Sequence, residues 1–305
     1  MSYSLRFIRM CDAFSDHPYP ATQNHPHGLR AWLAGFARTM KRQLNAAAAR
    51  RDELRAAEQI RAADYLAGNI MIVSSVGAGG DDCLAALLGA HSAGGGGFVV
   101  LDTMFDPEPW TDIEMGVRGE DTDHVAAILP LNGAAPEHPL LVMSIRNAAQ
   151  RGMGLYSGLP GWLYREDRTP ATGTMLEAVL TALAHPDVPA MPPDRPFIIA
   201  IRDVDQWQQD RLAALFQWAP TAGIRVIATT RFDRRGHTAQ TVPAAGQFDT
   251  TVVFRPGSHH QAEMAAQWLD MDDPHAADRL RSMDLGRCLI VRGAETRYGW
   301  LTRTA

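Results

Sequence analysis

A glycine-rich turn, Gly77 to Gly80, is the first feature of this sequence that could do chemistry. It lies between the apolar run "IMIV" and the apolar segment "CLAALLGA". Backbone N–H groups in such a turn, with the positive end of a following helix, can hold phosphate groups. A phosphate-binding P-loop then needs a lysine for the phosphates and a serine or threonine for Mg²⁺. Here those two positions are Gly80 and Asp81, so the turn lacks both side chains.

Two carboxylates, Asp81 and Asp82, begin the helix that we predict after the turn. Aspartates at a helix N-terminus accept backbone N–H groups and interact favourably with the helix dipole. They would fill the place of a phosphate and repel it, at a cost on the order of a few kcal/mol if partly buried. Three interpretations remain: an acid-capped strand–turn–helix, which the residues favour, a weak or altered nucleotide site, and a working hydrolytic P-loop.

A second set of polar residues follows the apolar run "FIIAI", which ends at Ile201. In a working nucleotide site, an apolar strand of this kind ends in Asp-Glu beside Mg²⁺ and the attacking water. Here the next residues are Arg202 and Asp203, with Asp205 close behind. Asp203 takes the water-activating place in the direct register and the metal-side place in a shifted one. In the direct register Arg202 replaces the metal-side aspartate, so no Mg²⁺ is expected. The alternative interpretation is that Arg202, Asp203 and Asp205 are solvated charges at the end of a strand.

A third set is found in "GIRVIATTRFDRR". Thr229 and Thr230 at the end of a strand could sense a γ-phosphate, or could simply end the strand. Arg231, Arg234 and Arg235 form a local basic cluster, which is our candidate for contacting nucleic acid or phosphate. A solvated charged loop is the alternative interpretation of the same residues.

Alternating strands and helices must position these side chains. Several of the apolar runs are continuous, which is typical of strands buried on both faces in a parallel sheet covered by helices. The predicted strands are 69–76, 97–103, 139–145, 196–201, 223–230 and 248–255, with a closing hairpin at 287–293 and 298–303. The predicted helices are 81–91, 172–185, 205–218, 259–269 and 274–283.

The N-terminal region differs from the rest. Residues 1–27 are rich in Pro, Asn and His and have no regular pattern, whereas residues 28–66 are helical in composition. Leu29, Trp32, Leu33, Phe36 and Met40 form an apolar stripe at helical spacing. We expect two parts: residues 1–67, an irregular segment and helical arm, and residues 68–305, an α/β domain.

Composition excludes several classes of protein. The 305 residues are 46% hydrophobic with a net charge of -5, so the chain as a whole is not a basic nucleic-acid binder. Three dispersed cysteines argue against a disulfide framework or structural zinc, and no metal site is expected. No apolar run reaches the ~20 residues of a membrane helix, and no signal peptide is visible. We expect a cytoplasmic protein that reaches the inner membrane only through partners.

Taken together, these segments resemble the FtsK/HerA group of P-loop ATPases. That group includes DNA-pumping motors and the coupling and energising ATPases of conjugation and type IV secretion. The resemblance covers roughly residues 68–293. It rests on "MIVSSVGAGGDD" at the place of the Walker A loop, "PFIIAIRDVDQW" at the Walker B strand, "GIRVIATTR" at the following strand, and "LRSMDLGRCLIVRG" at the closing hairpin. The resemblance implies a RecA-like fold with a mostly parallel sheet and helices on both faces.

The sequence departs from the family at the nucleotide site. Gly80 and Asp81 replace the Walker A lysine and Ser/Thr, Arg202 and Asp203 replace the Walker B Asp-Glu, and Thr230 replaces a polar Gln. Phosphoryl transfer depends on positioned charge, and the lysine is lost and the metal is not expected. In the degenerate loop Gly77, Gly79, Gly80, Asp81 and Asp82 remain the nucleotide-binding candidates, with ATP and Mg²⁺ expected to bind weakly or not at all.

We therefore expect a catalytically degenerate homologue, more a structural or regulatory subunit than an enzyme, in a conjugative DNA-transfer or type IV secretion machine. Its partners would be proteins of that machine, within a homo- or hetero-oligomer, and the arm at residues 28–66 would dock on one of them. Two alternatives remain. One is an active ATPase whose site is completed in trans; the other is a non-catalytic nucleic-acid-binding module that contacts DNA through the arginines at 231–235.

Overall fold

The computed structural model describes part of the chain. The chain divides into two compact units, residues 1–56 and 57–305. In the first unit, residues 39–45 are helical, as predicted, and the rest of the predicted arm up to residue 58 lies almost entirely outside the described residues. The described residues are 37, 39–45, 49, 59–103, 106, 113, 115–118, 139–159, 163, 165–188, 191–192, 194–232 and 247–302.

Within the described residues of the second unit, ten strands form one sheet in the order β1-β10-β9-β8-β2-β7-β6-β3-β5-β4. The neighbours from β8 to β4 run parallel, and β9 is antiparallel to both of its neighbours. The strands are β1 (Gln59–Arg61), β2 (Ile70–Ser74), β3 (Phe98–Asp102), β4 (Met115–Arg118), β5 (Gly154–Gly158), β6 (Phe197–Ile201), β7 (Ile224–Arg231), β8 (Thr250–Phe254), β9 (Cys288–Arg292) and β10 (Glu295–Thr302).

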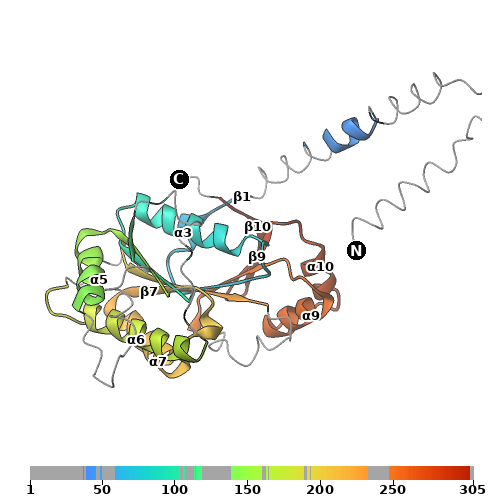
Figure 1. Ribbon diagram of the computed structural model, residues 1–305. Helices are drawn as coiled ribbons and strands as arrows, with labels where there is room; N and C mark the ends of the chain where they lie inside the picture. Colours follow the sequence, from blue (N-terminus) through green and yellow to red (C-terminus); the bar gives the residue numbers. More distant parts are fainter. Residues whose placement is uncertain are drawn as a thin grey trace, which may run out of the picture. The chain divides into compact units, whose positions relative to one another are not determined.

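Helices cover both faces of this sheet (Figure 1). Side chains alternate along a strand, so Ile70 and Ile72 of β2 pack with α3 on one face. Met71 and Val73 lie in the core of the other face, with α5, α6, α7, α9 and α10. The helices are α3 (Gly80–Ala93), α5 (Pro139–Arg151), α6 (Arg165–Leu183), α7 (Gln209–Trp218), α9 (His259–Trp268) and α10 (Ala276–Ser282). The predicted α/β fold, with a mostly parallel sheet between helices, is confirmed.

One predicted strand is wrong: residues 139–145 begin the helix α5. The run "PLLVMSI" is apolar enough for a buried strand, but a short apolar run cannot be told from a buried helix by periodicity alone. The helical spacing becomes visible only farther along, because Leu141, Ile145, Ala148 and Ala149 are the buried residues. The sequence analysis also missed β4 and β5, and β5 contains two glycines that hide its strand character.

The end of the predicted arm also differs from expectation. Residues 59–61 form β1, which pairs in parallel with β10 so that Ile60 lies opposite Leu301. Ala62–Tyr65 then form a short 3-10 helix. The Ala- and Arg-rich composition favours an α-helix, but burial of Ile60 in the core on the α3 face overrides that local preference.

Among the described residues, no helix has the length and apolar character needed to cross a membrane.

Candidate functional site

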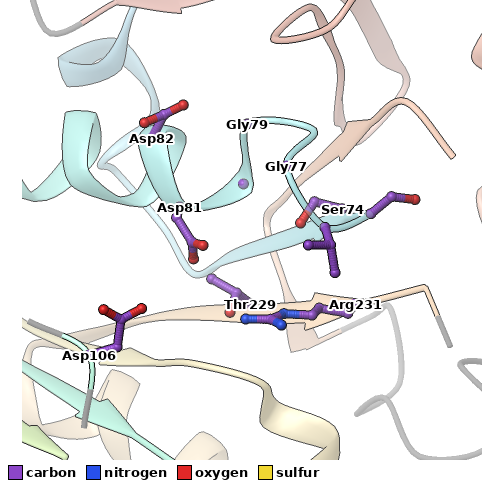
Figure 2. Close-up of a pocket in the computed structure, with 11 residues that line it drawn as sticks. Ser74, Gly77, Gly79, Asp81, Asp82, Asp106, Thr229 and Arg231 are labelled. Atoms are coloured by element: carbon purple, nitrogen blue, oxygen red, sulfur yellow. The ribbon is translucent and has the colours of Figure 1, made fainter. Parts of the chain in front are cut away.

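The site lies where parallel strands end, the edge at which open α/β sheets bind ligands. The turn between β2 and α3 faces the ends of β7 and β3 across a cavity of about 350 Å³ (Figure 2). The residues that line the cavity are Ser74, Ser75, Val76, Gly77, Gly79, Gly80, Asp81, Asp82, Asp106, Thr229 and Arg231. Most of the residues that the sequence singled out therefore share one cavity.

The turn has the backbone that its glycines predict. Gly77 and Gly79 have φ values of 71° and 114°, in the left-handed region that side-chain-bearing residues rarely adopt. The N–H of Ala78 donates to the carbonyl of Ser75 at 3.0 Å, which closes the turn. Gly79 is the N-cap of α3, so the helix starts at Gly80. A second turn supports the first, because the N–H of Gly286 donates to the carbonyl of Ala78 at 3.1 Å.

Position 80, where a P-loop has its lysine, has no room for a side chain. A Cβ placed on Gly80 would lie 2.8 Å from the Cβ of Ser74 and closer still to the Ser74 Oγ. Such contacts are well inside van der Waals distance, so β2 or α3 would have to shift. Ser74 stands where the P-loop pattern has its first glycine, and its side chain takes the space beside residue 80.

The two aspartates at the start of α3 point to opposite sides of its first turn (Figure 2). The Asp81 carboxylate accepts a hydrogen bond from Nη2 of Arg202 at 3.1 Å. The expectation that Asp81 and Asp82 cap the helix is wrong, because neither has a hydrogen bond to a backbone N–H among the described residues. Asp81 therefore pairs with the side chain of Arg202, whereas Asp82 is exposed.

Arg202 lies at the centre of a buried ionic cluster. Its side chain is 4% exposed, and its Nη1 pairs with the carboxylate of Asp102, which is 1% exposed. The Asp106 carboxylate lies 3.7 Å from the same nitrogen. Burial acts to lower the pKa of Arg202, but Asp102 and Asp81 outweigh it and the pKa is raised. The guanidinium therefore stays charged, shared by three carboxylates.

Tyr156 on β5 holds two of those carboxylate residues in place. Its hydroxyl donates to Asp102 Oδ2 at 3.0 Å and accepts the N–H of Asp106 at 2.6 Å. Burial, with the negative charge of Asp102, raises the pKa of this hydroxyl, so it stays protonated and able to donate. Asp102, Asp106 and Tyr156 were not predicted as site residues. Asp102 ends a strand, as site residues often do, but only the adjacency of β3 and β6 brings it to Arg202.

Asp203, the candidate for activating water, is held by β7. Its N–H donates to Thr229 Oγ1 at 3.1 Å, and its carboxylate pairs with Arg231 Nε at 3.0 Å. Its φ of 50° is rare for a residue other than glycine. Burial raises the pKa of Asp203 to about 6, against the opposing effects of Arg231 and Arg202.

Of the remaining predicted residues, some lie within the described residues and others do not. Thr230 donates from Oγ1 to Asp205 at 3.2 Å, so the second threonine and the second aspartate of the predicted site also meet. Arg231 is 45% exposed and lines the cavity. Arg234 and Arg235 lie outside the described residues, so the basic cluster at 231–235 stays a prediction.

These side chains do not fit a magnesium nucleotide. A bound Mg²⁺ needs oxygen ligands in near-octahedral geometry, and in the direct register the metal-side position carries the guanidinium of Arg202 instead. Among the described residues, no group of three or more His, Cys, Asp or Glu is arranged to hold a metal ion. The cavity lining combines the carboxylates of Asp81, Asp82 and Asp106 with the guanidinium of Arg231, and position 80 has no lysine.

Comparison with known proteins gives a likeness of fold. No family model matches the chain, and no curated protein matches it. Among solved structures, VirB4 of Thermoanaerobacter pseudethanolicus has a TM-score of 0.52 at 9% identity and covers 78% of this chain and 90% of that one. The trigonal form of the bacterial conjugative coupling protein TrwB, in complex with sulphate, has a TM-score of 0.51 at 13% identity, covering 79% and 87%.

A third solved structure is the genome-packaging NTPase B204 of Sulfolobus turreted icosahedral virus 2, in complex with ATP-gammaS. It has a TM-score of 0.50 at 9% identity and covers 77% of this chain and 98% of that one. Identities this low show the fold alone. The chain therefore has the RecA-like P-loop NTPase fold, and the predicted likeness to the FtsK/HerA-like ATPase group is confirmed at the level of the fold.

Proposed function

We propose that this chain is a catalytically degenerate FtsK/HerA-like homologue that serves as a structural or regulatory subunit of a conjugative DNA-transfer or type IV secretion machine. The machine context is supported by two structural neighbours, a bacterial conjugative coupling protein and VirB4. The loss of catalysis is supported by one observation, the ion pair between Arg202 and Asp81.

That ion pair joins the two positions that hold Mg²⁺ in a working site. A Ser/Thr hydroxyl after the P-loop and an aspartate after the Walker B strand contact the metal in P-loop NTPases. Here these positions carry opposite charges, Asp81 and Arg202, and contact each other at 3.1 Å. A guanidinium in that place repels a divalent cation. Phosphoryl transfer without the metal and the lysine loses the charges that stabilise its transition state.

The test is isothermal titration of the full-length chain with ATP and Mg²⁺, followed by a hydrolysis assay with and without DNA. We expect neither binding heat nor phosphate release. A rebuilt variant, Ser74→Gly/Gly80→Lys/Asp81→Ser/Arg202→Asp/Asp102→Asn, serves as the positive comparison. It restores the lysine, the serine and the metal-side aspartate, clears the space for the lysine, and removes the buried charge that Arg202 would leave unpaired. Micromolar binding by the wild-type chain, with hydrolysis lost in Asp203→Asn, would overturn the proposal.

One observation favours the active-ATPase alternative. Asp203 stands at the water-activating position of the direct register, with a raised pKa of about 6 and a strained backbone, features that gather at functional sites. Activity would then require a cation supplied by a neighbouring chain. The alternative predicts hydrolysis that rises more steeply than the protein concentration, because the complete site forms only in the assembly.

A further inference from the structure

One side chain joins three parts of the molecule that are far apart in sequence. Arg202 follows β6, Asp102 ends β3, and Asp81 lies in the first turn of α3. In the sheet, β6 and β3 are neighbours, but β7 separates β6 from β2, the strand that leads into α3. The contact between Arg202 and Asp81 therefore reaches across β7. It connects the start of α3 to the strand ends on the far side.

Burial and charge make this connection difficult to release. The Arg202 side chain is 4% exposed, so its charge depends on the carboxylates around it. The Asp102 partner is equally buried, whereas Asp81 is about half exposed. Removing one partner of a buried pair leaves an uncompensated charge in the interior. Asp81 can be changed without leaving a fully buried group alone, and the same holds for Asp106, which is 48% exposed.

Two of these three places, the start of the helix and the end of the apolar strand, are connected by a ligand in a working P-loop site. There, Mg²⁺ with its nucleotide bridges the first turn of the helix to the carboxylate after the apolar strand. We propose that Arg202 is a built-in cation that performs this bridging in place of Mg²⁺. It fixes the turn at residues 74–82 and the start of α3 to the ends of β3 and β6, with no nucleotide bound. The inference rests on the proposed function, and it states how that degenerate site is kept ordered.

Contacts on both sides of Arg202 support a single fixed shape of the turn. Tyr156 binds the carboxylate of Asp102 and the backbone N–H of Asp106, so the β3 side of the cluster is also held by a contact that does not involve Arg202. On the α3 side, the packing of Ser74 against Gly80 and the hydrogen bond from Gly286 to Ala78 restrict the turn. The turn, including Val76 at 82% exposure, is then held in one conformation, independent of any nucleotide cycle.

The experiment is hydrogen exchange of the full-length chain, read by mass spectrometry, for the wild type, Asp81→Asn and Asp82→Asn. Asp82 is the matched control because it is adjacent, exposed and without an ion-pair partner among the described residues. We expect amides of residues 75–83 to exchange about tenfold faster in Asp81→Asn, as loss of a charge-assisted hydrogen bond predicts. Asp82→Asn should match the wild type, and the strands should be unchanged in both.

The outcomes separate the inference from the proposed function. Equal exchange at residues 75–83 in Asp81→Asn and the wild type would overturn the inference and leave the proposed function standing. Slower exchange of these residues when ATP and Mg²⁺ are added to the wild type would overturn the proposed function, because a nucleotide would then be ordering the turn. Faster exchange in Asp81→Asn, with no effect of ATP and Mg²⁺ on the wild type, supports both. Arg202→Lys provides a second check, since lysine keeps the charge but cannot bridge the same carboxylates.

Discussion

The side chain of Ser74 occupies the space in which a Cβ of residue 80 would lie. Any larger residue at position 80 is therefore overpacked, and overpacking a tight site typically costs about 1–3 kcal/mol. We expect Gly80→Ala to lower the free energy of unfolding by that amount in urea titrations. Ser74→Gly in the same background should restore most of the loss, because it removes the atoms that clash.

Gly89, in the same helix, is the matched control for that prediction. A Cβ at Gly89 meets no atom within 4 Å. Alanine there should raise stability by about 0.4–1 kcal/mol, since it reduces the freedom of the unfolded chain. Similar effects of Gly80→Ala and Gly89→Ala would contradict the described packing of the turn.

Replacing Arg202 by methionine should be strongly destabilising. The change leaves Asp102 buried without its cation, and breaking a buried pair in this way costs about 3–5 kcal/mol. The comparison is Arg211→Met, which removes an ion pair to Glu177 in which both side chains are 46% exposed. Exposed pairs contribute about 0–1 kcal/mol. Chemical denaturation of both variants measures the difference, and equal losses would contradict a buried ionic cluster.

Stability should depend on pH through Asp203. Its pKa is about 6 in the folded chain against an ordinary value of 3.8. Between about pH 4 and pH 6 the folded chain therefore holds a proton on Asp203 that the unfolded chain has lost. The pKa differs by about two units between the two states, and each unit corresponds to about 1.4 kcal/mol. Raising the pH through this window should lower the stability of the wild type relative to Asp203→Asn. Parallel pH profiles for the two proteins would show that Asp203 is not a buried acid.

Tyr156→Phe should loosen the β3 side of the cluster. The change removes the donor to Asp102 and the acceptor for the Asp106 N–H. A buried group left without its partner costs about 1–3 kcal/mol, so a loss of that size is expected in thermal or urea unfolding. A neutral substitution would mean that the hydroxyl is not needed to hold these aspartates.

Much of the fold was predictable because its strands are continuous apolar runs. The predicted strands 69–76, 196–201 and 223–230 correspond to β2, β6 and β7, which position the turn, Arg202 and Thr229. The prediction from local pattern was wrong at α5, Pro139–Arg151, because the helical spacing of buried residues becomes visible only beyond residues 139–145, which were predicted as a strand. It was wrong again at Ile60, which joins the sheet because of a partner strand about 240 residues away.

The site was predictable only where a motif marks it. Gly80, Asp81, Arg202 and Asp203 were found because each stands at a known position of the P-loop or Walker B pattern. Their interaction was not predictable, since it depends on the order of strands in the sheet. Asp102 and Tyr156 lie on β3 and β5, and their closeness to Arg202 follows from β6, β3 and β5 being successive neighbours.

The most direct test of the account asks whether a divalent cation binds where Arg202 lies. Electron paramagnetic resonance counts bound Mn²⁺, a paramagnetic replacement for Mg²⁺, in the full-length chain with ATP present. Asp81→Ser/Arg202→Asp/Asp102→Asn is the comparison, because it returns oxygen ligands to both positions and removes the buried charge that Arg202 would leave unpaired. The account predicts no protein-bound Mn²⁺ in the wild-type chain. One Mn²⁺ per wild-type chain, dependent on ATP, would contradict the claim that the guanidinium of Arg202 has taken the place of the metal.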